Sequence, residues 1–350
     1  MASFPYISLS FVALFVSCSH FVLMNDVEFH EVRPKNEIVL IRDSTFHLEY
    51  EGLQSCTDMQ ILNDTLLVIQ NRACEDAPYF FNLWSLRSDQ YLGSFARQGR
   101  GPGEYISPHI SRSPTWERFL YFTDNGTCKA YVIDPQEALS HESDYWPDEI
   151  GLSGADVSWL PIQRNKQFVA TLADEKMVFN TLDIDGECTC SIDVFRNINY
   201  YDNATTMSHM LCATSNSDVV AEVLLFFPYI NFIDSRTGQV RSYSTHRDYR
   251  KWRAVLNKPI NMNSIQYYAG LTSSKDYVFA TYWGIPLGSI INNDWSSTIH
   301  VFDNLGHFVY AIHTSEKVGH ITIDSEAKYL YGIDLTEDKI IRYDLGPLRE

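Results

Sequence analysis

The sequence predicts an all-β fold, a six-bladed β-propeller built from four-stranded antiparallel blades. Beyond residue 36, most segments are short runs of β-branched and aromatic residues bounded by Asn, Asp, Ser or Gly, and sustained helical spacing is rare. Strands ending at an aspartate recur along the chain, with successive separations of 49, 51, 69 and 41 residues, at Asp134, Asp183, Asp234, Asp303 and Asp344. A period of about 40 to 50 residues with four short strands per unit is typical of a propeller.

The repeat divides the chain into six units, because Ser85 occupies the same slot 49 residues before Asp134. The units lie near residues 57–98, 107–140, 155–196, 207–245, 264–313 and 318–344. The 69-residue interval contains two segments that we interpret as loop insertions, 246–265 and 283–295. The alternative is a seventh, small blade within that interval.

The last unit contains only about three strands, whereas a spare strand, "STFHLEY" at 44–50, precedes the first unit. Unpaired edge strands are a liability that a closed ring removes. We therefore expect the N-terminal strand to pair into the last blade and to close the ring.

The N-terminus predicts export. Residues 4–24 contain no Asp, Glu, Lys or Arg, and Cys18 follows Val16 and Ser17 at the end of an apolar run. This segment resembles a bacterial lipoprotein signal, which implies cleavage before Cys18 and acylation of its thiol. An uncleaved membrane anchor is the alternative, since the run is just long enough to span a bilayer.

The domain organisation follows from these segments. We expect a lipoprotein signal peptide at 1–17, a linker at 18–35 after the lipidated cysteine, and a single propeller domain at 36–350. The predicted location is the cell envelope of a Gram-negative-type bacterium, anchored to a membrane through Cys18 and facing the periplasm or the cell surface.

Composition excludes one class of partner. The chain has 27 basic and 44 acidic residues and a formal net charge of −17. An acidic surface repels phosphate backbones, so we expect no nucleic acid partner. Six cysteines remain after Cys18 and are sparse for this length, so we expect buried free thiols at Cys56, Cys74, Cys128, Cys188, Cys190 and Cys212.

One glycine-rich loop, "FARQGRGPGEY" at 95–105, is the strongest local motif. It has neither the following helix nor the Lys-Ser/Thr or G-x-G-x-x-G spacing that a phosphate-binding loop needs, so we do not expect a nucleotide. The run R-x-G-x-G-P-G-E-[FY] resembles the blade-linking loop of NHL-repeat propellers and, more closely, of TolB-like six-bladed propeller lipoproteins. Its residues here are Arg97, Gly99, Gly101, Pro102, Gly103, Glu104 and Tyr105. The resemblance implies a six-bladed propeller tethered to an envelope membrane, without a defined activity.

The loop has two interpretations. Arg97 and Glu104 could pair across it and fix its shape, while Tyr105 plugs the space between two blades. Alternatively, Arg97 and Arg100 offer cationic donors at the channel mouth to an anionic ligand or partner. We take Arg97, Arg100 and Glu104 as the candidate binding loop.

Catalytic motifs are scarce, since the sequence contains no G-x-S-x-G and no H-E-x-x-H. We therefore predict a non-catalytic scaffold, without a cofactor, that binds an unknown protein or small molecule. The alternative is a lactonase or hydrolase with calcium held by channel carboxylates. That chemistry needs several converging oxygen ligands, and inner-strand candidates such as Asp156 and Asp324 supply few.

Overall fold

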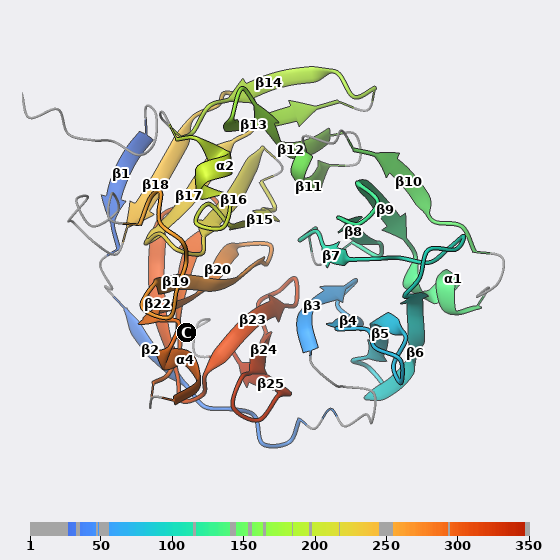
Figure 1. The fold of residues 1–350 in the computed structure, drawn as a ribbon. Coiled ribbons are helices and arrows are strands. Elements are labelled where there is room, and N and C mark those ends of the chain that lie inside the picture. The colour runs from blue at the N-terminus through green and yellow to red at the C-terminus, as the bar shows by residue number, and fades with distance from the viewer. Residues whose placement is uncertain are drawn as a thin grey trace, which may run out of the picture.

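Six β-sheets stand around a common axis (Figure 1). The computed structural model describes residues 27–32, 36–46, 48, 56–114, 117–140, 145–152, 156–163, 166–183, 185–195, 198–216, 218–244, 255–292 and 295–346. The predicted signal peptide and Cys18 lie outside these residues. None of the helices in the described ranges is long and apolar enough to cross a membrane.

Blades 1 to 3 are four-stranded and follow the chain from the inner to the outer strand. Blade 1 contains β3 (Cys56–Leu62), β4 (Leu66–Asn71), β5 (Tyr79–Ser85) and β6 (Gln90–Arg97). Blade 2 contains β7 (Pro108–Ile110), β8 (Leu120–Asp124), β9 (Lys129–Ile133) and β10 (Asp148–Gly151), with α1 (Pro135–Ser140) before its last strand. Blade 3 contains β11 (Asp156–Gln163), β12 (Lys166–Ala173), β13 (Lys176–Leu182) and β14 (Cys188–Ile192).

Blades 4 to 6 complete the ring. Blade 4 contains β15 (His209–Ala213), β16 (Val219–Leu224), β17 (Tyr229–Asp234) and β18 (Val240–Ser244), after the short α2 (Tyr200–Asn203). Blade 5 contains β19 (Ile265–Ser273), β20 (Tyr277–Pro286), β21 (Thr298–Asp303) and β22 (Phe308–Thr314), with α4 (Ser289–Asn292) between its second and third strands. Blade 6 contains β23 (Val318–Ile323), β24 (Tyr329–Asp334) and β25 (Lys339–Asp344).

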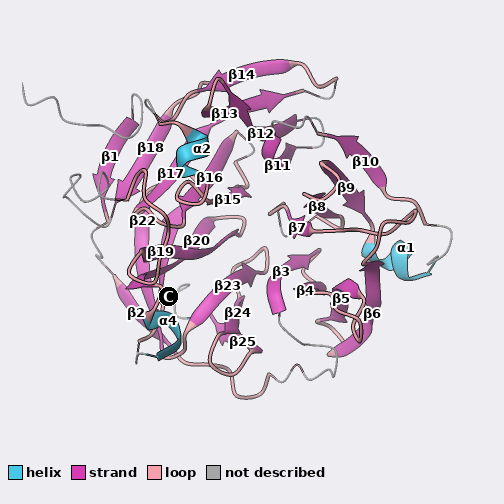
Figure 2. Cartoon of the chain, viewed as in Figure 1, coloured by secondary structure: helices cyan, strands magenta, loops and turns pink. Residues whose placement is uncertain are grey.

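The predicted fold class is confirmed: the protein is a six-bladed propeller, and strands dominate the described chain (Figure 2). In the part of the long interval that the structure describes, the second predicted insertion contains α4 and there is no seventh blade, while residues 245–254 lie outside the described chain. One boundary differs from the prediction, because blade 2 continues beyond residue 140. Its fourth strand, β10, is separated from β9 by the short helix α1, in place of a tight hairpin.

Three of the recurring aspartates, Asp183, Asp234 and Asp303, cap the hairpin between the third and fourth strands of their blades. Asp234 Oδ1 accepts hydrogen bonds from the backbone N–H of Arg236 at 2.9 Å and of Thr237 at 2.7 Å. Asp303 Oδ1 accepts them from Leu305 at 2.9 Å and His307 at 2.8 Å. An aspartate that bonds the backbone two residues on favours a tight turn, which is why the residue recurs with the period of the blades.

The N-terminal segment forms a strap around the outside of the ring, where Figure 1 shows it in blue. Strand β1 (Val27–Glu31), inside the segment expected to be a linker, pairs in parallel with β18 of blade 4. Strand β2 (Glu37–Leu40) pairs in parallel with β22 of blade 5. The strap therefore covers two consecutive outer edges.

Ring closure begins just before the predicted strand at 44–50. Arg42 forms an antiparallel bridge with Tyr343 of β25, and the N–H of Asp43 donates to the Arg342 carbonyl at 2.8 Å. The Asp43 carboxylate also accepts two hydrogen bonds from the Arg342 guanidinium, at 3.0 and 2.6 Å. Phe46 is buried beside Tyr331, with ring centroids 5.4 Å apart. Residues 47, 49 and 50 of the predicted strand lie outside the described chain.

Aromatic side chains join neighbouring blades. Phe81 of blade 1 lies 5.2 Å from Phe122 of blade 2, and Phe232 of blade 4 lies 5.3 Å from Phe302 of blade 5, measured between ring centroids. Such pairs add to the free energy of burial that holds the ring together.

The prediction of buried free thiols is right only in part. All six described cysteines are unpaired with one another, and Cys212 is buried, but three are exposed: Cys74, Cys128 and Cys188. The exposed thiols lie at the rim and in loops, where the strand pattern gives no information about depth.

Candidate functional site

A short segment of blade 2 extends across the axis of the ring. Arg112, two residues after β7, forms a parallel bridge with Cys212 of β15, and its carbonyl accepts a hydrogen bond from the Ala213 N–H at 3.2 Å. Gln60 of β3 donates from Nε2 to the Ser113 carbonyl at 2.8 Å. Blades 1, 2 and 4 therefore meet at this level of the channel.

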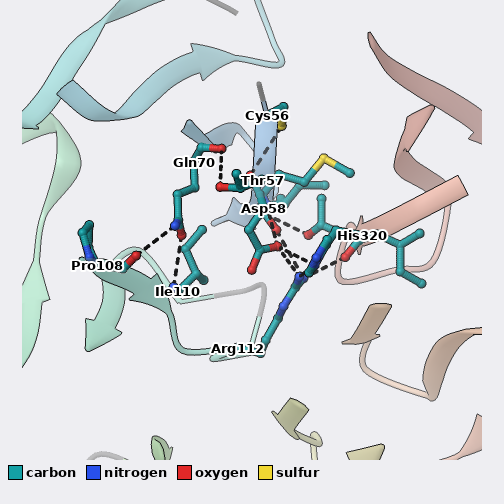
Figure 3. Close-up of polar contacts among 12 residues, drawn as sticks. Cys56, Thr57, Asp58, Gln70, Pro108, Ile110, Arg112 and His320 are labelled. Atoms are coloured by element: carbon teal, nitrogen blue, oxygen red, sulfur yellow. Dashed lines mark hydrogen bonds and ion pairs between the residues drawn. The ribbon is translucent and has the colours of Figure 1, made fainter. Parts of the chain in front are cut away.

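The Arg112 side chain lies at the centre of this meeting point (Figure 3). Its Nη1 donates to the carbonyls of Ile321 at 2.8 Å and Met59 at 3.3 Å. Its Nη2 pairs with the carboxylate of Asp58 and lies 3.2 Å from His320 Nδ1. Both terminal nitrogens of the guanidinium thus have partners in blades 1 and 6.

The electrostatics of this cluster are internally balanced. Burial opposes ionisation of Asp58, but the neighbouring Arg112 and His320 outweigh it and hold the pKa of Asp58 below its ordinary value. His320 Nδ1 lies 3.3 Å from Asp58 Oδ1. An Asp–Arg pair that satisfies itself in the interior stabilises one arrangement of the ring and leaves little charge for a ligand.

The alternative function needs several oxygen ligands that converge on one calcium ion in the channel. Within the described ranges, no three His, Cys, Asp or Glu side chains come together in a way that could hold a metal ion. Asp324 caps the β23–β24 turn, where its Oδ1 accepts hydrogen bonds from the N–H groups of Glu326 at 3.1 Å and Lys328 at 2.9 Å. The side chain of Asp156 lies outside the described part of the chain.

The glycine-rich loop is folded onto its own backbone. The Tyr105 N–H donates to the Arg97 carbonyl at 2.9 Å, and the Gly99 N–H donates to the Tyr105 carbonyl at 3.0 Å. The Glu104 carboxylate turns inward and accepts a hydrogen bond from the Gly101 N–H at 2.8 Å. A Cβ on Gly99 would lie 1.8 Å from Glu104 Oε2, so a larger residue there would displace the Glu104 carboxylate.

The expected ion pair across the loop does not form. Glu104 binds the loop backbone instead, and neither Arg97 nor Arg100 makes an ion pair with any described residue. Both arginines are exposed. Tyr105 behaves as predicted: it is buried, 5.2 Å from Phe122 and 5.1 Å from Tyr131 between ring centroids, in the core shared by blades 1 and 2.

Two hollows flank the loop. One, of about 490 Å³, is lined by Arg100, Ile106, Lys129, Tyr131 and Glu149 among others. The second, of about 290 Å³, lies beside Tyr79, Phe95, Arg97, Ala138 and Tyr145. Both hollows are also lined by Trp146 and by the loop residues Pro102 to Tyr105. The loop therefore forms a ridge with one free arginine on each side.

The most exposed aromatic ring at the ridge is that of Trp146, which is 67% exposed. Sequence reasoning did not select Trp146, because the segment between α1 and β10 has no strand or helix pattern. The only local signal is a large aromatic residue within an acidic, proline-containing stretch, "SDYWPDE".

The ridge lies away from the channel mouth, contrary to expectation. Its hollows are lined by residues of β9, of β10 and of the segment before β10, in the outer half of blade 2. In Figure 1 this is the outer margin that carries β6, β10 and α1. We call this area the rim surface and define it by Arg97, Arg100, Glu104, Ile106 and Trp146.

Comparison with known proteins agrees with this architecture. Solved structures that are similar to the chain include the following three. A member of the DUF4221 family from Bacteroides vulgatus has 13% identity over 87% of this chain and 97% of its own, with a TM-score of 0.57. A putative exported protein from Bacteroides fragilis has 14% identity over 91% and 98%, with a TM-score of 0.54. Hydrazine synthase from Kuenenia stuttgartiensis has 13% identity over 88% and 81%, with a TM-score of 0.50.

At such identities, these similarities show the fold alone. No curated protein matches the sequence. Residues 28–326, however, match the TolB-like 6-blade propeller-like family. The six blades, the blade-linking loop and this match lead to one conclusion: the chain belongs to the TolB-like six-bladed propeller family.

Proposed function

We propose that the protein is a lipid-anchored, extracytoplasmic scaffold that binds an anionic partner, a protein or a small molecule, at the rim surface. One observation carries this proposal. Arg97 and Arg100, which form no ion pair with a described residue, lie with the exposed Trp146 around two hollows. Arg and Trp are enriched among residues that dominate binding energy, and a guanidinium recognises carboxylates and phosphates in a bidentate manner.

The contacts of Arg112 in the channel favour a binding protein over an enzyme. Arg112 occupies the axis and bonds carbonyl groups of two blades, and its charge is matched by Asp58. A general acid or base needs to be in reach of a substrate, whereas the Arg112 and Asp58 side chains are largely buried and bonded to each other. The rim surface, in contrast, is open.

The proposed location depends on Cys18. Its setting resembles a lipoprotein signal, and one similar structure is described as a putative exported protein. We place the propeller in the envelope of a Gram-negative-type bacterium, on a membrane through the acylated thiol. The test is fractionation: the wild-type protein should follow the membrane, and Cys18→Ser should not.

The binding role is tested by cross-linking in native envelopes. The double variant Arg100→Ala/Trp146→Ala should bind the captured partner with a Kd at least about tenfold higher than that of the wild type. Truncation of such hot-spot residues often costs about 2 kcal/mol or more of binding free energy. The matched control, Arg87→Ala/Tyr201→Ala, removes an exposed arginine and an exposed aromatic residue elsewhere on the ring. Equal capture by the wild type and the rim-surface variant would refute the proposal.

A further inference from the structure

The outermost strand of blade 5 exposes an apolar face. Val39 of β2 is 72% exposed, and Ile41, directly after β2, is 82% exposed. Residues two apart on an extended chain point to the same side, so the two side chains form one patch. Ile38 and Leu40, on the opposite side, pack into the core between blades 5 and 6.

The patch is bordered by polar groups that can remain hydrated. Glu37, on the same side as Val39, has its Oε2 4.0 Å from Nε2 of His313. Arg42 follows the patch and pairs with Glu337 at 3.1 Å. The apolar pair is thus a small exposed patch with a charged border and is not part of a buried core.

The strap places this patch opposite the rim surface. In a ring of six, blades 4 and 5 stand across the axis from blades 1 and 2. Figure 1 shows β1, β18, β22 and β2 at the left margin and β6, β10 and α1 at the right margin. A membrane or a partner that contacts the strap side of the ring therefore leaves the rim surface on the opposite, outward side.

We propose that the strap side of blades 4 and 5 lies against the lipid bilayer, with Val39 and Ile41 in contact with the headgroup region. The inference rests on the proposed lipid anchor at Cys18. Only eight residues, 19–26, lie between Cys18 and the start of β1 at Val27, which makes nine steps along the chain. Fully extended, nine steps span at most about 30 Å, so the outer edge of blade 4 cannot move far from an acylated thiol.

The anchor makes a weak contact effective. Two apolar side chains alone would not hold a protein with a net charge of −17 on a membrane. A tether turns the second contact into an intramolecular one at high effective concentration, so the same two side chains suffice to bias the orientation. The result is a propeller that stands on its strap side and presents the rim surface outward.

Photo-cross-linking of the full-length, lipidated protein tests this orientation. Benzoylphenylalanine is introduced at position 39, 41 or 92, and the protein is incorporated into vesicles of phosphatidylethanolamine and phosphatidylglycerol. Leu92 is the matched control, because it is an apolar residue, 42% exposed, on the outer strand of blade 1 at the opposite side. We expect lipid adducts, detected by mass spectrometry, from positions 39 and 41 to exceed those from position 92 several-fold.

The outcomes separate the two proposals. If Cys18→Ser stays with the membrane as the wild type does, the anchor is wrong and the inference falls with it. If the wild type is anchored but positions 39 and 41 give no more lipid adducts than position 92, the anchor stands and the orientation alone is refuted. Adducts to protein at positions 39 and 41 in native envelopes, without lipid adducts in vesicles, would also refute it.

Discussion

Replacing a single buried carboxyl group should change how the stability of the ring depends on pH. Glu222 lies in the middle of β16 and is fully buried. Its Oε2 accepts a hydrogen bond from Asn231 Nδ2 at 2.8 Å, and its Oε1 has no partner in the described structure. Burial outweighs the Asn231 bond and raises the pKa of Glu222 from 4.5 to about 8.

The sign of the effect follows from linkage. Because the pKa of Glu222 is higher in the folded protein, its protonated form is favoured there. The contribution of protonated Glu222 to stability is fully present below about pH 4.5 and is lost as the pH rises towards 8. At about 1.4 kcal/mol per pKa unit, the free energy of unfolding should fall by about 3 kcal/mol between about pH 5 and pH 8. Glu222→Gln, which cannot ionise, should not show this loss.

The assay is urea unfolding of both proteins at these two pH values, compared through the free energy of unfolding. We expect Glu222→Gln to gain about 3 kcal/mol over the wild type as the pH is raised. Glu75→Gln, at an exposed loop position, controls for the exchange of carboxyl for amide. A difference between Glu222→Gln and the wild type that is the same at both pH values would refute the reasoning.

Three further predictions concern the axis, the loop and the ring closure. Arg112→Leu leaves the Asp58 carboxylate buried without its partner and should lower the free energy of unfolding by about 3–5 kcal/mol, whereas Arg112→Leu/Asp58→Asn should recover part of it in the same urea assay. Gly99→Ala should lower the melting temperature because its Cβ meets Glu104 Oε2, and the same change should cost less in a Glu104→Ala background, where that clash is absent. Additive effects of the two changes on the melting temperature would contradict the geometry. The pKa of Asp43 is lowered to about 2 by its hydrogen bonds to Thr45 and Arg342, so its contribution is present above about pH 4 and is lost towards pH 2. Asp43→Asn should accordingly speed hydrogen exchange in β25 at neutral pH, and unchanged exchange would exclude this closure contact.

The sequence was sufficient for features that depend on neighbours along the chain. Alternation of apolar residues predicts strands, and an aspartate such as Asp234 forms its turn with the next few backbone groups. The close approach of Gly99 to Glu104 belongs to the same class, because the two residues are only five positions apart. The candidate loop was found in this way. Its position at the rim, away from the channel mouth, was not predicted.

The tertiary structure decided the rest, since it brings together residues that no local pattern relates. Arg112 bonds carbonyls 53 and 209 positions away, and its segment has no periodicity that would mark it as the centre of the ring. The parallel pairing of β1 and β2 with blades 4 and 5 is equally invisible in the sequence, because a strap can lie on any open edge. Trp146 became part of a surface only because α1 and β10 fold it beside a loop more than 40 residues earlier. The periodic packing of the strands depends on the local order of the residues and can be predicted from it. Contacts across the axis and around the rim form only when the ring has closed.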